Sequence, residues 1–94
     1  MKKPLIIRPE VLQRLAAMAR ADNRRCWETI ATLIETFGRP HVHAGIGIRK
    51  LGPGLFECRT DLKLRILFRD RPDGIDLFFI GNHDEVQRLL RSEK

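Results

Sequence analysis

The alternation of apolar and polar residues over positions 55 to 69 constrains the fold more than any other feature of this chain. Side chains on a β-strand point alternately to the two faces of a sheet, so apolar residues two apart lie together. Phe56 and Cys58 form one such set, and every second residue from Leu62 to Phe68 forms the next. The pattern predicts two antiparallel strands that bury one face of a sheet.

The connection between these two strands follows from the need to keep both apolar sets on one face. A turn at residues 60–62 places Arg59 opposite Lys63 and Glu57 opposite Arg65. A two-residue loop would instead put apolar and charged side chains on the same face, which a sheet with one buried side does not tolerate. We therefore expect a loop of odd length.

A second hairpin is indicated by the sequence Arg-Pro-Asp-Gly at positions 71–74. Proline sets φ for a type I turn, and glycine lets the chain leave it. If Asp70 lies opposite Ile75, the apolar residues of both strands again share a face. The predicted pairs are then Phe68 with Leu77, Ile66 with Phe79, and Arg69 with Asp76. The open face would carry four cations and two carboxylates with three apolar residues among them: Glu57, Arg59, Lys63, Arg65, Arg69 and Asp76, with Leu67, Phe78 and Ile80.

Helical spacing of apolar residues precedes the sheet. Residues 5–7 form a short first strand, and Pro9 suits the first turn of a helix that continues to about Ala21. The apolar face of this helix is expected in the core: Val11, Leu12, Leu15, Met18 and Ala19.

A second helix is predicted after Asp22 and Asn23, which break the first pattern and offer a cap. Gly38 and Pro40 are expected to end this helix. Its apolar side chains are also assigned to the core: Trp27, Ile30, Leu33, Ile34 and Phe37.

A short last helix is predicted from Asn82 and Glu85, whose spacing is typical of a capping arrangement. Its inward residues are Val86, Leu89 and Leu90. The element order is then one strand, two helices, three or four antiparallel strands and a short helix, an α+β fold. Ninety-four residues suffice for one modest core, so a single domain over residues 1–94 is expected.

Charge and cysteine content limit the functions that such a domain can have. Eighteen lysines and arginines against twelve acids give a net charge of +6, which favours a polyanionic partner. Cys26 and Cys58 form neither a disulfide framework nor a zinc motif, and we expect both to be small buried hydrophobes in a reducing compartment. No segment has the pattern of a signal peptide or a membrane span, so we expect a cytoplasmic protein with no membrane partner.

Four short motifs carry a resemblance to a known family: Lys50-Leu51, the segment 54–59, the segment 65–68 and the segment 81–86. The second and third resemble the "GLxELR" and "YRLxY" strands of the RelE/ParE superfamily of toxin-antitoxin toxins. The fourth, Gly-Asn-His-Asp-Glu-Val, resembles the "GTHxEY" ending of its HigB and YafQ branches. The resemblance implies the RelE-like β-α-α-β-β-β(-α) fold, an antiparallel curved sheet packed on an αα-hairpin.

The resemblance also implies a function, that of a ribosome-dependent mRNA endonuclease held inactive by a cognate antitoxin protein. Arg65 matches the family's sheet arginine that contacts the scissile phosphate, and His83 falls where HigB and YafQ relatives carry an acid-base histidine. Arg59 and Lys50 match motif positions as well. The chain departs from the family pattern because it contains no tyrosine. A mechanism that uses tyrosine is excluded, which leaves a histidine-based mechanism or none.

The chemistry of metal-free RNA cleavage fits these residue types without reference to the family. The reaction needs a base for the 2′-hydroxyl proton, an acid for the 5′-oxygen leaving group, and cations where charge develops on phosphorus. Histidine suits the first two roles and arginine the third. Glu57 or Asp84 can orient His83 or share the proton transfer. The candidate catalytic residues are His83, Arg65 and Glu57, and the candidate RNA-binding cations are Lys50, Arg59, Lys63 and Arg69, with no metal or other cofactor.

Structural interpretations of the same residues stay open. His83 can simply occupy the first turn of a helix, and the sheet cations can form a solvated face that pairs with Glu57 and Asp76. The pair His41 and His43 could contribute to a metal site with His83, or lie in a loop. The glycines between positions 45 and 54 lack both phosphate-loop and dinucleotide patterns, and we interpret them as turn and bulge residues.

Two functional classes therefore remain. The first is an endonuclease that acts on mRNA at the ribosome, and the second is a ParE-like protein that inhibits DNA gyrase by protein contacts, or a degenerate non-toxic relative. Both predict a more acidic antitoxin segment that covers the cationic sheet.

Overall fold

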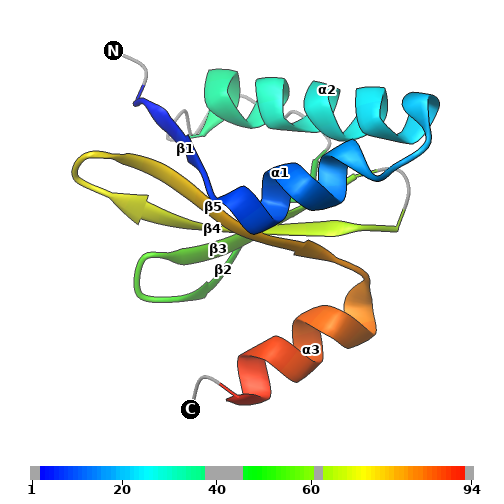
Figure 1. Cartoon of the computed structure of the whole chain (residues 1–94). Coiled ribbons are helices and arrows are strands. Elements are labelled where there is room, and N and C mark those ends of the chain that lie inside the picture. Colours follow the sequence, from blue (N-terminus) through cyan, green and yellow to red (C-terminus); the bar gives the residue numbers. More distant parts are fainter. Residues whose placement is uncertain (1–2, 38–45, 61–62, 93–94) are drawn as a thin grey trace.

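The computed structural model describes residues 3–37, 46–60 and 63–92, which form five strands and three helices around one sheet (Figure 1). In chain order the elements are β1 (Leu5–Ile7), α1 (Pro9–Ala16), α2 (Arg20–Thr36), β2 (Arg49–Gly52), β3 (Leu55–Arg59), β4 (Arg65–Arg71), β5 (Gly74–Gly81) and α3 (His83–Ser92). The α+β prediction is confirmed, and β2 adds the fourth antiparallel strand.

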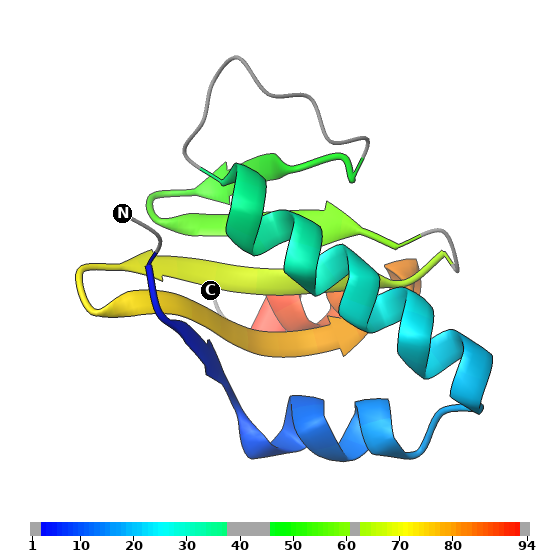
Figure 2. The same cartoon turned by 90° about the horizontal axis from the view of Figure 1, so that it is seen from above.

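The sheet has the strand order β1-β5-β4-β3-β2, in which β1 is parallel to β5 and the other neighbours are antiparallel. α1 and α2 cover one face of the sheet, and α3 lies on the opposite side, after the end of β5 (Figures 1 and 2). The face away from α1 and α2, which we call the open face, is therefore covered only in part, near β5.

The core lies between the sheet and the helical hairpin, as the strand parity predicts. Cys58, Ile66 and Phe68 are fully buried there, and the rings of Phe37 and Phe56 pack against Phe68 with centroids 5.2 and 5.5 Å away. Both cysteines are buried free thiols, which confirms their assignment as core residues. Burial raises the pKa of the Cys58 thiol to about 12.

The loop between β3 and β4 is longer than predicted. Arg59 pairs with Arg65 and not with Lys63, because the N–H of Thr60 donates to the carbonyl of Leu64 at 2.9 Å and closes a five-residue connection. The predicted pairing of the strands was therefore wrong by two residues. Its odd loop length was right, so the described members of both apolar sets still share the core face, and Leu62 lies outside the described residues. The neighbouring pairs are Glu57 with Leu67 and Cys58 with Ile66.

The β4–β5 hairpin has the predicted turn and the predicted pairs Phe68 with Leu77, Arg69 with Asp76 and Asp70 with Ile75. An irregularity between Leu67 and Phe68 then shifts the register. Ile66 pairs with Ile80, so the predicted pair of Ile66 with Phe79 was wrong. Ile80 belongs to the core cluster and not to the open face, where Phe79 lies opposite Leu67 instead.

The boundary between the first two helices also differs from the prediction. α1 ends at Ala16 and α2 already begins at Arg20, so Asp22 and Asn23 lie inside α2. The side-chain amide of Asn23 donates to the carbonyl of Leu15 at 2.8 Å, which satisfies the end of α1 rather than the start of α2. Three side chains that were assigned to the core are exposed: Leu12, Ala19 and Trp27. The predicted stop signals Gly38 and Pro40 lie outside the described residues.

The last helix follows the predicted capping arrangement. The N–H of Glu85 donates to Oδ1 of Asn82, and the N–H of Asn82 donates to Oε1 of Glu85, both at 2.9 Å. Val86 is fully buried, whereas Leu89 and Leu90 are half-buried. Among the described helices, none has the length and apolar character needed to cross a membrane.

Candidate functional site

Three of the predicted cations line one pocket at the end of the open face. Arg59 comes from the end of β3, Lys63 from the connecting loop and Arg65 from the start of β4, with Thr60 between them. We call this pocket of about 360 Å³ the basic pocket. Lys63 lines the pocket and has a positive φ of 62°. Three cations around a small hollow are suited to bind a phosphate group.

Glu57 lies beside the basic pocket and is 2% exposed. Nη1 of Arg65 donates to both of its carboxylate oxygens, at 3.1 and 3.0 Å. From the other side, Nη2 of Arg49 lies 3.5 Å from Oε1. The structure thus brings together Glu57 and Arg65, and it adds Arg49, which our sequence reasoning missed.

The two basic residues of β2 face opposite sides of the sheet. Arg49 pairs with Glu57 on the open face, whereas Lys50 pairs with Phe56, whose ring packs against the core. Lys50 is exposed at the edge of the sheet and does not line the basic pocket. Strand parity would have selected Arg49 if the limits of β2 and its register had been known.

His83 is the first residue of α3 and is exposed. Gly81, two residues before His83, pairs with Arg65 in the β4–β5 ladder. His83 therefore begins α3 at the same end of the sheet as the basic pocket. A Cβ on Gly81 would lie 2.8 Å from the Phe79 ring and 3.1 Å from Cβ of Glu85. This close approach fixes how α3, and with it His83, leaves the sheet.

Arg69 belongs to a different part of the open face. It lies four residues from Arg65 along β4, about 13 Å away at ~3.3 Å per residue. Its guanidinium stands over the Phe78 ring at 4.6 Å, and its ladder partner is Asp76.

Asp76 is the second buried carboxylate of the sheet, with 1% exposure. Arg8 donates to it through Nε at 3.0 Å and Nη2 at 2.9 Å, and Arg71 donates through Nε at 3.1 Å. The hydrogen bonds from Arg8 hold the pKa of the Asp76 carboxyl below its usual value, and Asp76 in turn raises the pKa of Arg8. Both arginines are engaged, so we assign this cluster to stability.

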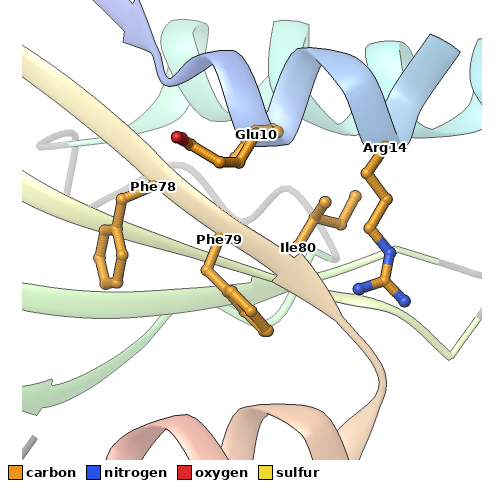
Figure 3. Close-up of a pocket in the computed structure, with 6 residues that line it drawn as sticks. Glu10, Arg14, Phe78, Phe79 and Ile80 are labelled. Carbon is orange, nitrogen blue, oxygen red and sulfur yellow. The ribbon is translucent and has the colours of Figure 1, made fainter.

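A smaller pocket of about 120 Å³ lies between α1 and β5 (Figure 3). Its apolar floor comes from β5, with Phe78, Phe79 and Ile80 among the lining residues, and Glu10 and Arg14 line it from α1. Arg14 also bonds Oε1 of Glu85 at 2.8 Å, which ties α1 to α3 and lowers the pKa of Glu85. One cation beside an apolar floor fits phosphate less well than the basic pocket does.

The alternative metal and phosphate-loop interpretations gain no support. His41 and His43 lie outside the described residues, and in the ranges that the structure describes no three metal-binding side chains gather. Gly54, with φ of 68°, lies in the β2–β3 turn, and Gly52 lies at a register shift, as turn and bulge glycines do.

The arrangement of a helical hairpin on one face of a five-stranded sheet and a last helix after the final strand defines an α+β protein of the RelE-like fold. Two solved structures are similar to the chain. One is the archaeal RelE-RelB complex from Pyrococcus horikoshii OT3, with a TM-score of 0.68, 22% identity, and coverage of 87% of this chain and 96% of that one. The other is the YoeB-YefM complex from Staphylococcus aureus, with a TM-score of 0.61, 17% identity, and coverage of 88% and 99%. No family model matches the sequence, and no curated protein matches it.

Proposed function

We propose that this protein is the toxin of a toxin-antitoxin system and that it cleaves mRNA on the ribosome without a metal or cofactor. The observation that carries the proposal is the basic pocket, in which Arg59, Lys63 and Arg65 meet beside a buried carboxylate. The RelE-like fold supports the toxin class, because the two similar structures are complexes of RelE with RelB and of YoeB with YefM. We place the protein in the cytoplasm, where mRNA is translated.

The proposed reaction is an attack of the 2′-hydroxyl oxygen on the adjacent phosphorus. Glu57 accepts the 2′-hydroxyl proton, the new bond forms a 2′,3′-cyclic phosphate, and His83 gives a proton to the departing 5′-oxygen. Arg65 neutralises the charge that develops on the phosphate oxygens, because its guanidinium stays ionised and donates in a fixed geometry. Arg59 and Lys63 hold the phosphate in the pocket.

RNA on either side of the scissile phosphate would run along the open face and past its edge at β2. Arg69 lies further along β4, and Lys50 lies at the edge strand β2. We propose both as weaker contacts to the RNA backbone, with a contribution that falls as salt concentration rises. A separate antitoxin protein with acidic side chains would cover the same cations and keep the toxin inactive.

The test is cleavage of a defined mRNA by the purified protein on translating ribosomes, with new 5′ ends mapped by primer extension. Removing the phosphate-stabilising group by Arg65→Ala is expected to slow cleavage by about 10²–10³-fold. His83→Ala should slow it by about 10²-fold or more. Arg91→Ala removes one exposed charge from the last turn of α3, away from the basic pocket, and serves as the matched control.

Loss of cleavage in Arg65→Ala and His83→Ala, with activity kept in Arg91→Ala, would support the endonuclease. If wild type arrests growth but cuts no mRNA, the gyrase-inhibitor alternative is favoured. The next measurement is then of gyrase-dependent DNA breaks. The absence of tyrosine favours that alternative, whereas the cationic pocket favours the enzyme.

A further inference from the structure

The carboxylate of Glu57 is held by cations from two strands that flank β3. Arg65 of β4 lies at 3.0 Å with a side chain that is 20% exposed, and Arg49 of β2 lies at 3.5 Å with a side chain that is 61% exposed. The Arg65 contact is the shorter and more buried of the two. Arg49 is the longer and more solvated contact, and it does not line the basic pocket.

This arrangement creates a competition at Arg65. Nη1 of Arg65 donates to both oxygens of Glu57, so a phosphate group that binds the other donors of this guanidinium must share its single positive charge with the buried carboxylate. A buried carboxylate that loses its cation is strongly destabilised. A second anion beside Arg65 is therefore tolerable only if another cation stays on Glu57.

We propose that Arg49 is a positioning residue that keeps Glu57 neutralised while Arg65 binds the phosphate. The inference rests on the proposed phosphate role of the basic pocket. Arg49 acts through Glu57, the proposed base, and is not itself proposed to contact RNA. Its sequence neighbour Lys50 does not share this role, because it points to the other face of the sheet.

The proposal fixes the order of phosphate affinities. Without Arg49, Glu57 depends on Arg65 alone, so less of the positive charge of Arg65 is available and phosphate binds more weakly. Without the charge of Glu57, the whole positive charge of Arg65 is available and phosphate binds more tightly. In that background Arg49 has no carboxylate left to hold, so its removal should cost no more than the loss of a nearby charge.

The experiment is a titration of the full chain with inorganic phosphate, followed by NMR through the Nε–H signal of Arg65. The variants are Arg49→Gln, Glu57→Gln, the double variant and Arg49→Lys, with Lys50→Gln as the control for loss of one nearby charge. We expect Arg49→Gln to weaken phosphate binding about threefold beyond the control. Glu57→Gln should strengthen it by about tenfold, and Arg49→Lys should restore most of the loss.

The decisive quantity is the coupling between the two substitutions. If Arg49→Gln weakens phosphate binding equally with Glu57 and with Gln at position 57, Arg49 acts only as a nearby charge and the inference fails. Failure of phosphate to bind even Glu57→Gln would overturn it as well. Because the probe is phosphate and not RNA, the result stands whether or not wild type cleaves mRNA, which the ribosome assay decides separately.

Discussion

Asp76→Asn is the substitution for which the structure gives the clearest magnitude. The carboxylate is 1% exposed and accepts hydrogen bonds from Arg8 and Arg71 at 2.9 to 3.1 Å. Breaking a buried ion pair typically costs about 3–5 kcal/mol. Here the two arginine side chains are 49% and 46% exposed, so they can return to water, and asparagine keeps one acceptor. We therefore expect a loss of about 2–3 kcal/mol at pH 7.

The cost of Asp76→Asn should depend on pH with a defined sign. The pKa of Asp76 lies below its ordinary value of 3.8 in the folded protein, chiefly because of the hydrogen bonds from Arg8. The stability that this carboxylate contributes is therefore present above about pH 4 and is lost as the pH falls through the lower folded pKa. Wild type and variant should therefore converge in stability as the pH falls below the ordinary value of 3.8.

The assay is urea unfolding of both proteins at pH 7 and at pH 3, followed by circular dichroism. Asp70→Asn is the matched control, because Asp70 pairs with Lys3 at the exposed end of the same hairpin. This substitution should lower the free energy of unfolding by less than about 1 kcal/mol. The reasoning is refuted if the cost of Asp76→Asn is the same at both pH values, or no greater than that of the control.

Three further outcomes follow from other contacts. Gly81→Ala should destabilise by about 1–3 kcal/mol, since the new Cβ would press on the Phe79 ring and on Glu85; Gly52→Ala, where nothing lies within 4 Å, is the control in the same urea melts. Glu85→Ala removes the carboxylate that accepts from the N–H of Asn82 and from Arg14, and should cost about 1–2 kcal/mol, with faster amide exchange confined to α3; exchange that rises equally throughout the chain would contradict a local role. The two buried thiols should not react with a disulfide reagent at pH 8 until the protein unfolds, because the pKa of Cys58 is raised to about 12; rapid labelling of the native protein would contradict this.

The sequence predicted the sheet well where apolar and polar residues alternate. In β3 and β4 the parity survived an error of two residues in the loop, because only an even error can keep both apolar sets in the core. In β5 the four consecutive apolar residues 77–80 contain no alternation. The register shift beside Phe78 therefore left no trace in the pattern, and the prediction exchanged the faces of Phe79 and Ile80.

The helices show a second limit of sequence-based prediction. A residue typical of a helix cap can bind a backbone group of another helix. Asn23 looks like a helix cap, but its amide satisfies the end of the preceding helix. Trp27 lies one position beyond Cys26, about 100° around the helix, and this offset leaves it 37% exposed while Cys26 is fully buried. Spacing alone places both residues near the same stripe, and only the packing of α2 on the sheet separates them.

Some residues of the candidate site could be predicted from local sequence patterns, and one could not. Arg59, Lys63 and Arg65 could be predicted together because two short strands and one loop carry all three. Arg49 could not, because its place depends on a strand whose register is shifted by a bulge.

The position of the proposed acid, His83, is likewise set by contacts that do not involve RNA. In a chain without tyrosine, the proposed mechanism assigns the leaving-group proton to His83, in the first turn of α3. That turn is held by the close approach of Gly81 to Phe79, by the capping box of Asn82 and Glu85, and by the bond from Arg14. These contacts hold the first turn of α3 even though the rest of the helix packs only through its apolar side. A histidine-based mechanism on this fold therefore needs a well-fixed helix start more than it needs a well-packed helix.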